Sequence, residues 1–284
     1  MIKNLVVLCT LLIVLNTKAQ QTEEQKYALT TSVSTDGLSI VSIVDPYLSP
    51  LNYSGFGYVS TDLERHFISP NTPLISTQYN SDFTVGVTLN PTATATILYY
   101  ERNYGRGFHY HLKPQSDTQI LLGGVIDLEF GFKQNSRNIN NPIAFDLSSN
   151  LNLSGILMHD FILFKRTMQL QLKLETPLLG SMFVPLQGSS YYEMFLLGDL
   201  SNTLHFSSLH NKIGINETIS LDIPFNHSVW RIGMNYHNLK YKANDMVFRR
   251  TEFSLIAGTT FDFVTFAGRK NKAPKNFIST KEIL

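Results

Sequence analysis

The residues that decide the fold are Met168-Gln169-Leu170-Gln171-Leu172-Lys173-Leu174-Glu175. Apolar and polar side chains alternate through this stretch without exception. Successive side chains of an extended strand point to opposite faces, so one face here is apolar and the other polar. The pattern predicts a β-strand that separates an apolar environment from a polar one.

The same alternation recurs along most of the chain. Leu122, Ile126 and Leu128, for example, alternate with Asp127 and Glu129. This rule predicts eleven strands, near residues 53–68, 78–89, 92–103, 106–113, 118–133, 143–158, 161–175, 191–206, 212–223, 228–241 and 248–266. Bacterial barrels have an even number of strands, and residues 29–44 supply a further candidate. We therefore predict an all-β fold, an antiparallel transmembrane β-barrel of 10–12 strands.

Composition favours the membrane barrel over a secreted soluble β-sandwich. Only 16% of the 284 residues are charged, against about 25% in a typical soluble domain. The polar strand faces carry Ser, Thr, Asn, Gly and Gln, whereas a sandwich would expose more Lys and Glu to water. Glu217 is an exception, since it lies on an apolar face beside Ile215 and Ile219. A carboxylate on a lipid-facing surface is unfavourable at mid-bilayer, so we expect Glu217 to lie near a membrane interface, or its strand to be misassigned.

The first residues have the pattern of an export signal. Lys3 precedes an apolar run from Leu5 to Leu15, and Thr17-Lys18-Ala19 ends in a small residue. The run is too short to span a bilayer as a helix, and it contains the single cysteine, Cys9. We predict a signal peptide at 1–19, an N-terminal segment at 20–52 (periplasmic, plug or first strand), the barrel at 53–268 and a basic polar tail at 269–284.

Three stretches carry a family resemblance: residues 46–55 (PYLSPLNYSG), 137–142 (RNINNP) and 185–193 (PLQGSSYYE). Together they resemble an uncharacterised family of outer-membrane β-barrel proteins in gut-type Gram-negative bacteria. The resemblance implies a barrel in the outer membrane. It implies no activity, substrate or catalytic residue.

The polar faces of the predicted strands would line the lumen. Their charged residues have both signs, which predicts pairing across a narrow or plugged interior, whereas a row of one sign is typical of an ion-selective pore. The predicted lumen-lining residues are Asp127, Glu129, Lys133, Lys173, Glu175, Arg231, His237, Glu252 and Asp262.

Two links between strands are candidates for ligand or partner contacts. Asn138, Asn140 and Asn141 precede Pro142 and are typical of a loop whose amides bond to the backbone. The longest predicted link, residues 176–190, ends beside Tyr191, Tyr192 and Glu193. These three residues would bind a ligand or partner, or anchor the loop at the membrane interface.

Reactive residue types are few. His109 and His111 share one face of a strand, but no carboxylate accompanies them in the nearby sequence, so we favour a role in the wall over a metal site. Ser208 and His210 lie in a segment that we interpret as a polar turn, because a nucleophile and its base are rarely so close in sequence. We predict no catalytic residue, cofactor or metal ligand.

The expected function is a narrow channel or transport accessory for small solutes. The net charge of +1 argues against nucleic acid as a partner. The expected partner is outer-membrane lipid. One alternative is a structural barrel that docks another envelope protein without conducting. The others are a lipid-modifying outer-membrane enzyme that uses Ser208 or His210, and the secreted β-sandwich.

Overall fold

A computed structural model describes residues 27–69, 71–112, 117–139, 141–198, 200–225, 228–263 and 277–280. The strands are β1 (Tyr27–Ala28), β2 (Thr30–Asp45), β3 (Ser49–Phe67), β4 (Ile75–Leu89), β5 (Thr96–Leu112), β6 (Thr118–Asn135), β7 (Ile143–Leu163), β8 (Arg166–Phe183), β9 (Leu204–Ser208), β10 (Lys212–Phe225), β11 (Ser228–Ala243), β12 (Met246–Phe263) and β13 (Phe277–Ile278). The helix α2 (Tyr191–Phe195) precedes β9.

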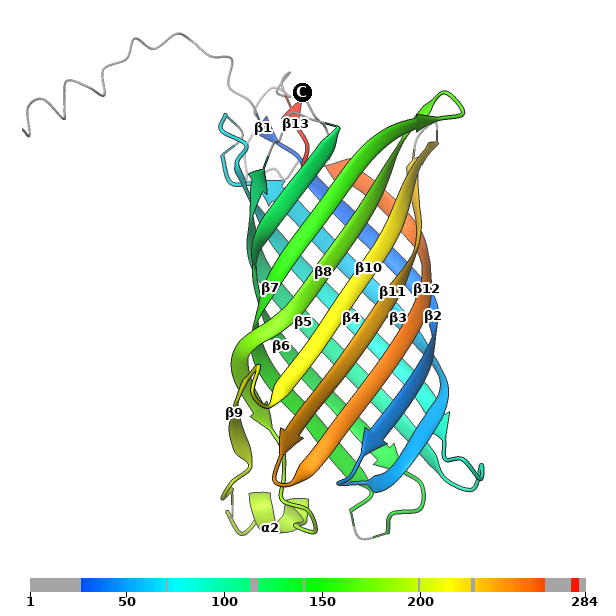
Figure 1. The fold of residues 1–284 in the computed structure, drawn as a ribbon, viewed down its shortest axis with the longest axis vertical. Helices are drawn as coiled ribbons and strands as arrows, with labels where there is room; N and C mark the ends of the chain where they lie inside the picture. The colour runs from blue at the N-terminus through cyan, green and yellow to red at the C-terminus, as the bar shows by residue number, and fades with distance from the viewer. Residues whose placement is uncertain are drawn as a thin grey trace, which may run out of the picture.

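Ten of these strands form one closed antiparallel ring (Figure 1). Each wall strand pairs with its neighbour in the order β2 to β8, then β10 to β12, and β12 pairs back with β2. This confirms the prediction of an all-β barrel of 10–12 strands. The sandwich alternative is wrong, because one sheet closes on itself instead of two sheets packing face to face.

The ring has two different ends. β1 and β13 form a short parallel pair beside one end, which we call the terminus end. The helix α2 lies at the other, which we call the loop end (Figure 1). An even number of wall strands brings the start of β2 and the finish of β12 to the same end, where Thr30 pairs with Phe263.

Several predicted strand boundaries are wrong. The two strands predicted at 92–103 and 106–113 are replaced by the single strand β5 at Thr96–Leu112. Gly105 lies inside it, where a Cβ would come within 2.2 Å of Asn80 Oδ1, so this glycine permits a close contact and not a turn. The break expected at residues 159–160 lies instead at Phe164-Lys165, which adopt φ values of 51° and 62°.

The predicted strand at 191–206 is also wrong over most of its length. Ser190 caps the helix α2: its side chain accepts a bond from Glu193 N, and the Glu193 carboxylate accepts one from Ser190 N. Only β9 remains as strand. Since β8 continues to Phe183, the longest link is 184–203 and not 176–190. β2 supplies a wall strand in place of the lost one.

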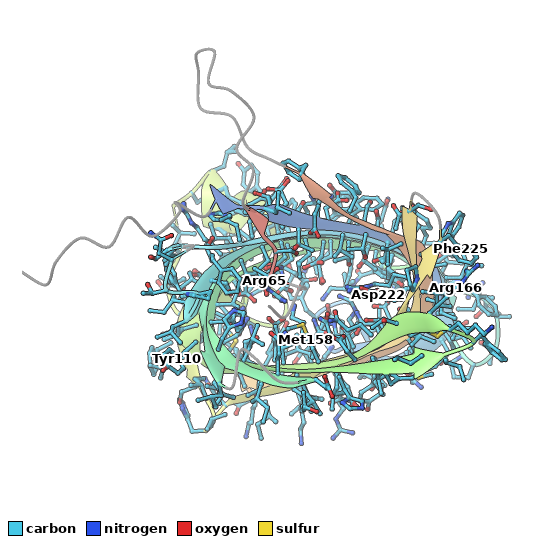
Figure 2. All side chains as sticks on the ribbon, turned by 90° about the horizontal axis from the view of Figure 1, so that it is seen from above. Arg65, Tyr110, Met158, Arg166, Asp222 and Phe225 are labelled. Atoms are coloured by element: carbon cyan, nitrogen blue, oxygen red, sulfur yellow. The ribbon has the colours of Figure 1, made fainter. Side chains whose placement is uncertain are left out.

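Side chains alternate between the inside and the outside of the ring. On β8, Leu170 and Leu174 are 43% and 40% exposed on the outer face, whereas Gln169 and Gln171 are 9% and 6% exposed inside. Viewed from the terminus end, Arg65 and Asp222 point into the interior and Tyr110 points outward (Figure 2). The structure therefore encloses polar side chains within an apolar outer surface.

The apolar surface has polar exceptions. Glu217 lies on the outer face of β10, at the register position between Leu174 and Tyr236. No helix within the described ranges has the length and hydropathy needed to cross a membrane.

Candidate functional site

The interior of the barrel gathers most of the charged residues predicted to line a lumen. Eight of them, Asp127, Glu129, Lys133, Lys173, Glu175, Arg231, His237 and Glu252, lie on the inward-facing positions of β6, β8, β11 and β12 and are buried or half-buried. Asp262 has the same parity but is exposed at the terminus end. There it accepts hydrogen bonds from Thr31 Oγ1 (2.6 Å) and Ser279 Oγ (2.9 Å).

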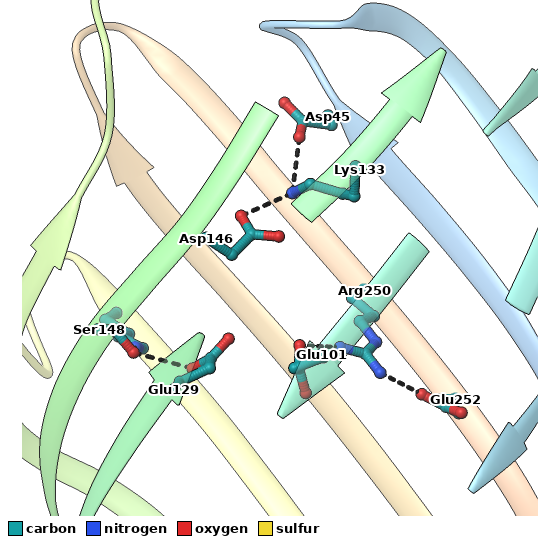
Figure 3. Close-up of polar contacts among 9 residues, drawn as sticks. Asp45, Glu101, Glu129, Lys133, Asp146, Ser148, Arg250 and Glu252 are labelled. Carbon is teal, nitrogen blue, oxygen red and sulfur yellow. Dashed lines mark hydrogen bonds and ion pairs between the residues drawn. The ribbon is translucent and has the colours of Figure 1, made fainter. Parts of the chain in front are cut away.

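Ion pairs cross the lumen near the loop end (Figure 3). Lys133 Nζ of β6 lies 2.7 Å from Asp45 Oδ2 of β2 and 2.8 Å from Asp146 Oδ1 of β7. Since β2 and β6 are not neighbours in the ring, this lysine bridges the interior. All three residues are largely buried, so the pairs are shielded from water and salt.

Arg250 makes a second bridge across the interior. It extends from β12 to Glu101 of β5 and also lies 2.5 Å from Glu252 Oε2 of its own strand (Figure 3). Its guanidinium carbon lies over the Tyr99 ring, 5.3 Å from the ring centroid. Lys133 and Arg250 therefore make two charged contacts across the interior.

A cavity of about 80 Å³ remains beside these bridges. Its lining is rich in hydrogen-bond acceptors, including Asp127, Glu129 and Asn80. Asp127 accepts bonds from Asn150 Nδ2 (2.9 Å) and Asn152 Nδ2 (2.5 Å), which are neutral donors. Lys212 enters from β10 and bonds Asn150 Oδ1 at 2.8 Å. This lining suits a polar solute with donors of its own.

Closer to the terminus end, the polar contacts join residues of neighbouring strands or of one strand. Arg231 contacts Asp222 with two bonds of 2.6 and 2.9 Å. Lys173 Nζ lies 2.9 Å from Glu175 Oε2, and Arg65 bonds Gln78 at 3.0 Å.

Sequence analysis missed Arg250, Glu101, Asp45 and Lys212, although a signal was available for the first two. Arg250 has the same parity as Glu252, and Glu101 has the same parity as its inward neighbour Tyr99. Lys212 is the first residue of its strand and Asp45 the last of its own, where alternation gives the weakest indication.

The loop end is closed by an apolar cluster. Tyr47, Tyr53, Ile97 and Met182 are buried there together with Met246. The remaining members of the cluster are Leu48, Ala95, Ala144, Val184 and Ala243, with Tyr191 and Tyr241 packed against them. Its members come from the links after β2, β4 and β8 and from the loop-end parts of six strands, so the cluster lies at the mouth of the barrel beside the Lys133 bridge.

Hydrogen bonds hold this closure in place. Tyr47 OH donates to Ser189 O (2.8 Å), and burial raises the pKa of Tyr47 to about 12. Tyr191 OH accepts from Phe145 N (2.7 Å), and its ring meets that of Tyr47 edge-on at 6.0 Å. Burial also raises the pKa of the Tyr191 hydroxyl, so both phenols are neutral at ordinary pH.

The predicted loop residues divide between this closure and the surface. Asn138 Nδ2 donates to Leu48 O (3.1 Å) and Asn141 Nδ2 to Ser189 O (3.2 Å), so both amides tie links together. Glu193 forms the cap of α2. Tyr192 is 60% exposed. Asn140 lies outside the described residues, as do the predicted signal peptide and most of the predicted tail.

The two histidine candidates on β5 are buried in the wall. His109 Nε2 bonds Ser154 Oγ (2.9 Å) and His111 Nε2 bonds Ser76 Oγ (2.8 Å), so each ring has a serine partner. Within the described ranges, no group of three or more His, Cys, Asp or Glu residues is arranged to hold a metal ion.

Ser208 and His210 lie close together at an exposed turn. Ser208 Oγ is 2.6 Å from His210 Nδ1. Asn211 does not orient this imidazole, because its side chain bonds Ser208 N (2.9 Å) and Phe206 O (2.9 Å). Among the residues that the structure describes, this turn has a serine–histidine contact but no hydrogen bond from a third group that would orient His210 as a catalytic base.

A family model, described as "Protein of unknown function (DUF3316)", matches residues 4–270. The chain belongs to the DUF3316 family. This confirms the resemblance to an uncharacterised family, while the gut-type bacterial source stays a prediction. No curated protein of known function matches the sequence.

Three solved structures are similar to this chain at low sequence identity. The translocator domain of the autotransporter NalP from Neisseria meningitidis is 7% identical, with 84% of this chain and 90% of that one covered at a TM-score of 0.43. The outer membrane protease OmpT from Escherichia coli is 8% identical, and the match covers 83% of this chain and 96% of OmpT at a TM-score of 0.45. The transport unit of the autotransporter AIDA-I from Escherichia coli is 7% identical, and the match covers 89% of this chain and 94% of the transport unit at a TM-score of 0.39. Likeness at this level brings no activity to the DUF3316 chain.

Proposed function

We propose that this DUF3316 protein is an outer-membrane transport barrel that admits small polar solutes into a gated lumen and prefers solutes with a positive charge. The observation that carries the proposal is the cavity of about 80 Å³ lined by Asp127, Glu129 and Asn80. A water molecule takes about 30 Å³ in the liquid, so the cavity has room for a few waters or one ammonium group.

The shape of the barrel supports a placement in the membrane. Single-chain outer-membrane barrels have short turns on the periplasmic side and longer loops outside. The longest link, 184–203, is at the loop end, and the start of β2 and finish of β12 are at the other. We therefore assign the terminus end to the periplasm and the loop end to the cell exterior.

The first test is electrophoresis of the folded, detergent-solubilised protein before and after boiling, followed by conductance of the same sample in a planar bilayer. A closed barrel should shift its mobility on boiling. Because the loop end is closed, the wild type should give brief, rare openings and no steady current. A steady current at low voltage would contradict the gated lumen.

A variant that removes the closure makes this test decisive. Tyr47→Ala combined with Tyr191→Ala removes two rings and the bond to Ser189 O from the loop end. Steady current should appear, with a reversal potential in a KCl gradient that favours K⁺ over Cl⁻. Tyr192→Ala is the matched control, because Tyr192 is 60% exposed and outside the cluster.

A second candidate function is docking of another envelope protein without conductance. Its support is a run of exposed apolar side chains after α2: Leu196, Leu197 and Leu200 are 73%, 66% and 52% exposed. If the Tyr47/Tyr191 variant keeps its heat-modifiable mobility and still carries no current, this second function is favoured. A cross-linked partner that is lost in Leu196→Ser with Leu197→Ser would then identify the surface.

A further inference from the structure

The wall of the barrel is not paired along its whole length. β8 pairs with β10 from Gln169–Asp222 to Glu175–Asn216, and then takes β9 as its partner from Leu179–Ser208 onward. The first four residues of β10, Lys212–Ile215, have no strand partner on that side among the described residues. We call this break between β8 and β10 the seam. Figure 1 shows β8 bending away from β10 toward the loop end.

Pro177 explains where the seam begins. Proline has no backbone N–H, so β8 cannot continue its ladder to β10 at this residue. On its other side, β8 passes a bulge, since Asn152 pairs with Pro177 but Leu151 pairs with Leu179. A hydrogen bond still crosses the seam, from Thr176 Oγ1 to Gly214 O at 2.8 Å.

The lumenal cavity extends into this seam. Its lining includes Asp127 and Glu129 on the inside, and Pro177, Gly214 and Ile215 where the wall divides. The side chain of Ile215 belongs to the outer face of β10 and is 40% exposed. The cavity therefore reaches the wall at the place where β8 and β10 separate.

The outer and inner sides of the wall at the seam differ in chemistry. On the outside, Phe206 and Ile213 are 64% and 61% exposed. On the inside, Asp127 and Glu129 share the cavity lining with Lys212, whose ammonium group bonds Asn150 Oδ1 and Ser148 Oγ and, among the described residues, forms no ion pair with either carboxylate. The Asn80 side chain is 5% exposed, and its Oδ1 has no hydrogen-bond partner. A buried acceptor without a partner is costly and indicates a missing donor.

We propose that the seam is a lateral portal through which a single-chain amphiphile with an ammonium head group moves between the bilayer and the lumenal cavity. The ammonium group donates to Asn80 Oδ1 and is attracted by Asp127 and Glu129. The hydrocarbon chain stays between Phe206, Ile213 and Ile215. The inference rests on the proposed function, because it uses the same cavity, but it adds the route and the ligand class.

Cysteine labelling tests the route. The single cysteine, Cys9, is replaced by serine, so that introduced thiols are unique. Asn216→Cys places a thiol in the cavity lining. Ser254→Cys is the matched control, because Ser254 is an inward residue of β12, is 2% exposed and lies in a fully paired part of the wall. If Asn216→Cys does not assemble, Asn103→Cys replaces it, since Asn103 lines the same cavity from β5.

The protein is reconstituted in phosphatidylcholine vesicles and treated with an N-alkyl maleimide that partitions into lipid. We expect the cavity thiol to react at least about tenfold faster than the control thiol, a difference that corresponds to about 1.4 kcal/mol in barrier. Dodecylammonium should slow this reaction severalfold and dodecanoate should not. Asp127→Asn with Glu129→Gln should abolish the protection while the labelling itself persists.

Failure of the portal and failure of the proposed function give different results. The portal is wrong if the lipid-phase reagent labels the cavity thiol no faster than the control thiol, while butylammonium still protects it from a water-soluble maleimide. The proposed function is wrong if neither ammonium compound protects the thiol from either reagent. Equal protection by dodecanoate would overturn the ligand class and leave the route intact.

Discussion

Two sections of the same wall differ in how completely they are closed. Between β11 and β12, the register runs without interruption from Val229–Thr260 to Ala243–Met246. Between β8 and β10, pairing ends at Glu175–Asn216 and the strands separate. Inside the barrel, Arg250 of β12 bridges to Glu101, and the cavity extends from Glu101 to the seam.

The difference shows that closure of a barrel depends on individual backbone donors. In lipid, an unpaired N–H or C=O is expensive, so a wall normally pairs along its full length. The seam begins at the one residue of β8 that has no N–H to offer, Pro177. A break at such a position is a place where the wall can exchange molecules with the bilayer.

The largest expected effect is on the closed section. Arg250→Met leaves the buried carboxylates of Glu101 and Glu252 without their cation, which should lower the free energy of unfolding by about 3–5 kcal/mol. Lys212→Met at the seam removes bonds to the neutral acceptors Asn150 Oδ1 and Ser148 Oγ and should cost about 1–3 kcal/mol. Urea unfolding followed by the fluorescence of the single tryptophan, Trp230, measures both. Equal losses would contradict the distinction between the two sections.

The next effect is on the outer face. Leu255 of β12 and Ile213 of β10 are both 61% exposed, so they form a matched pair. Leu255→Arg, in the middle of its strand, should cost about 2–4 kcal/mol in a lipid bilayer, and Ile213→Arg, at the start of β10, about 0–1 kcal/mol. Both costs are measured as the free energy of unfolding of the protein from lipid vesicles. A reversed order would place the seam, and not Leu255, at the membrane centre.

A smaller effect is expected when the missing donor is restored. Pro177→Thr supplies a backbone N–H that can pair across the seam and should stabilise the barrel by about 0.5–1.5 kcal/mol. It should also slow lipid-phase labelling of the Asn216→Cys thiol severalfold. Pro224→Thr is the control, because Pro224 already lies in the paired part of β10 opposite Val229. An unchanged labelling rate in Pro177→Thr would show that the proline is not the cause of the seam.

The smallest effect concerns the loop-end closure. Tyr47→Phe loses the bond to Ser189 O and should cost about 1 kcal/mol. The folded protein raises the pKa of Tyr47 from 10.0 to about 12, so the protonated phenol stabilises the fold fully below pH 10. That contribution is lost as the pH rises through 12. Between pH 9 and 12, the free energy of unfolding should fall more steeply in the wild type than in Tyr47→Phe. Parallel curves would show that the Tyr47 hydroxyl does not contribute in this way.

Much of the fold could be predicted from alternation alone. The stretch 168–175 gave the parity of β8, and the same rule placed Asp127 and Glu252 on inward-facing positions. The rule failed where side-chain bonds override periodicity, as at Ser190 and Glu193, whose reciprocal bonds make residues 191–195 a helix. It also failed at Gly105, because a close contact with Asn80 looks like a turn signal when only the sequence is visible.

The sequence by itself determined that this chain forms strands and which face of each strand is polar. These properties are local, because the direction of a side chain follows from its position in a period of two. Only the tertiary structure decided which residues meet across the lumen, as Arg250 and Glu101 do over 149 positions of sequence. It also decided that β8 leaves β10 at Pro177, because the number of strands and the register of the ring fix which backbone groups face each other.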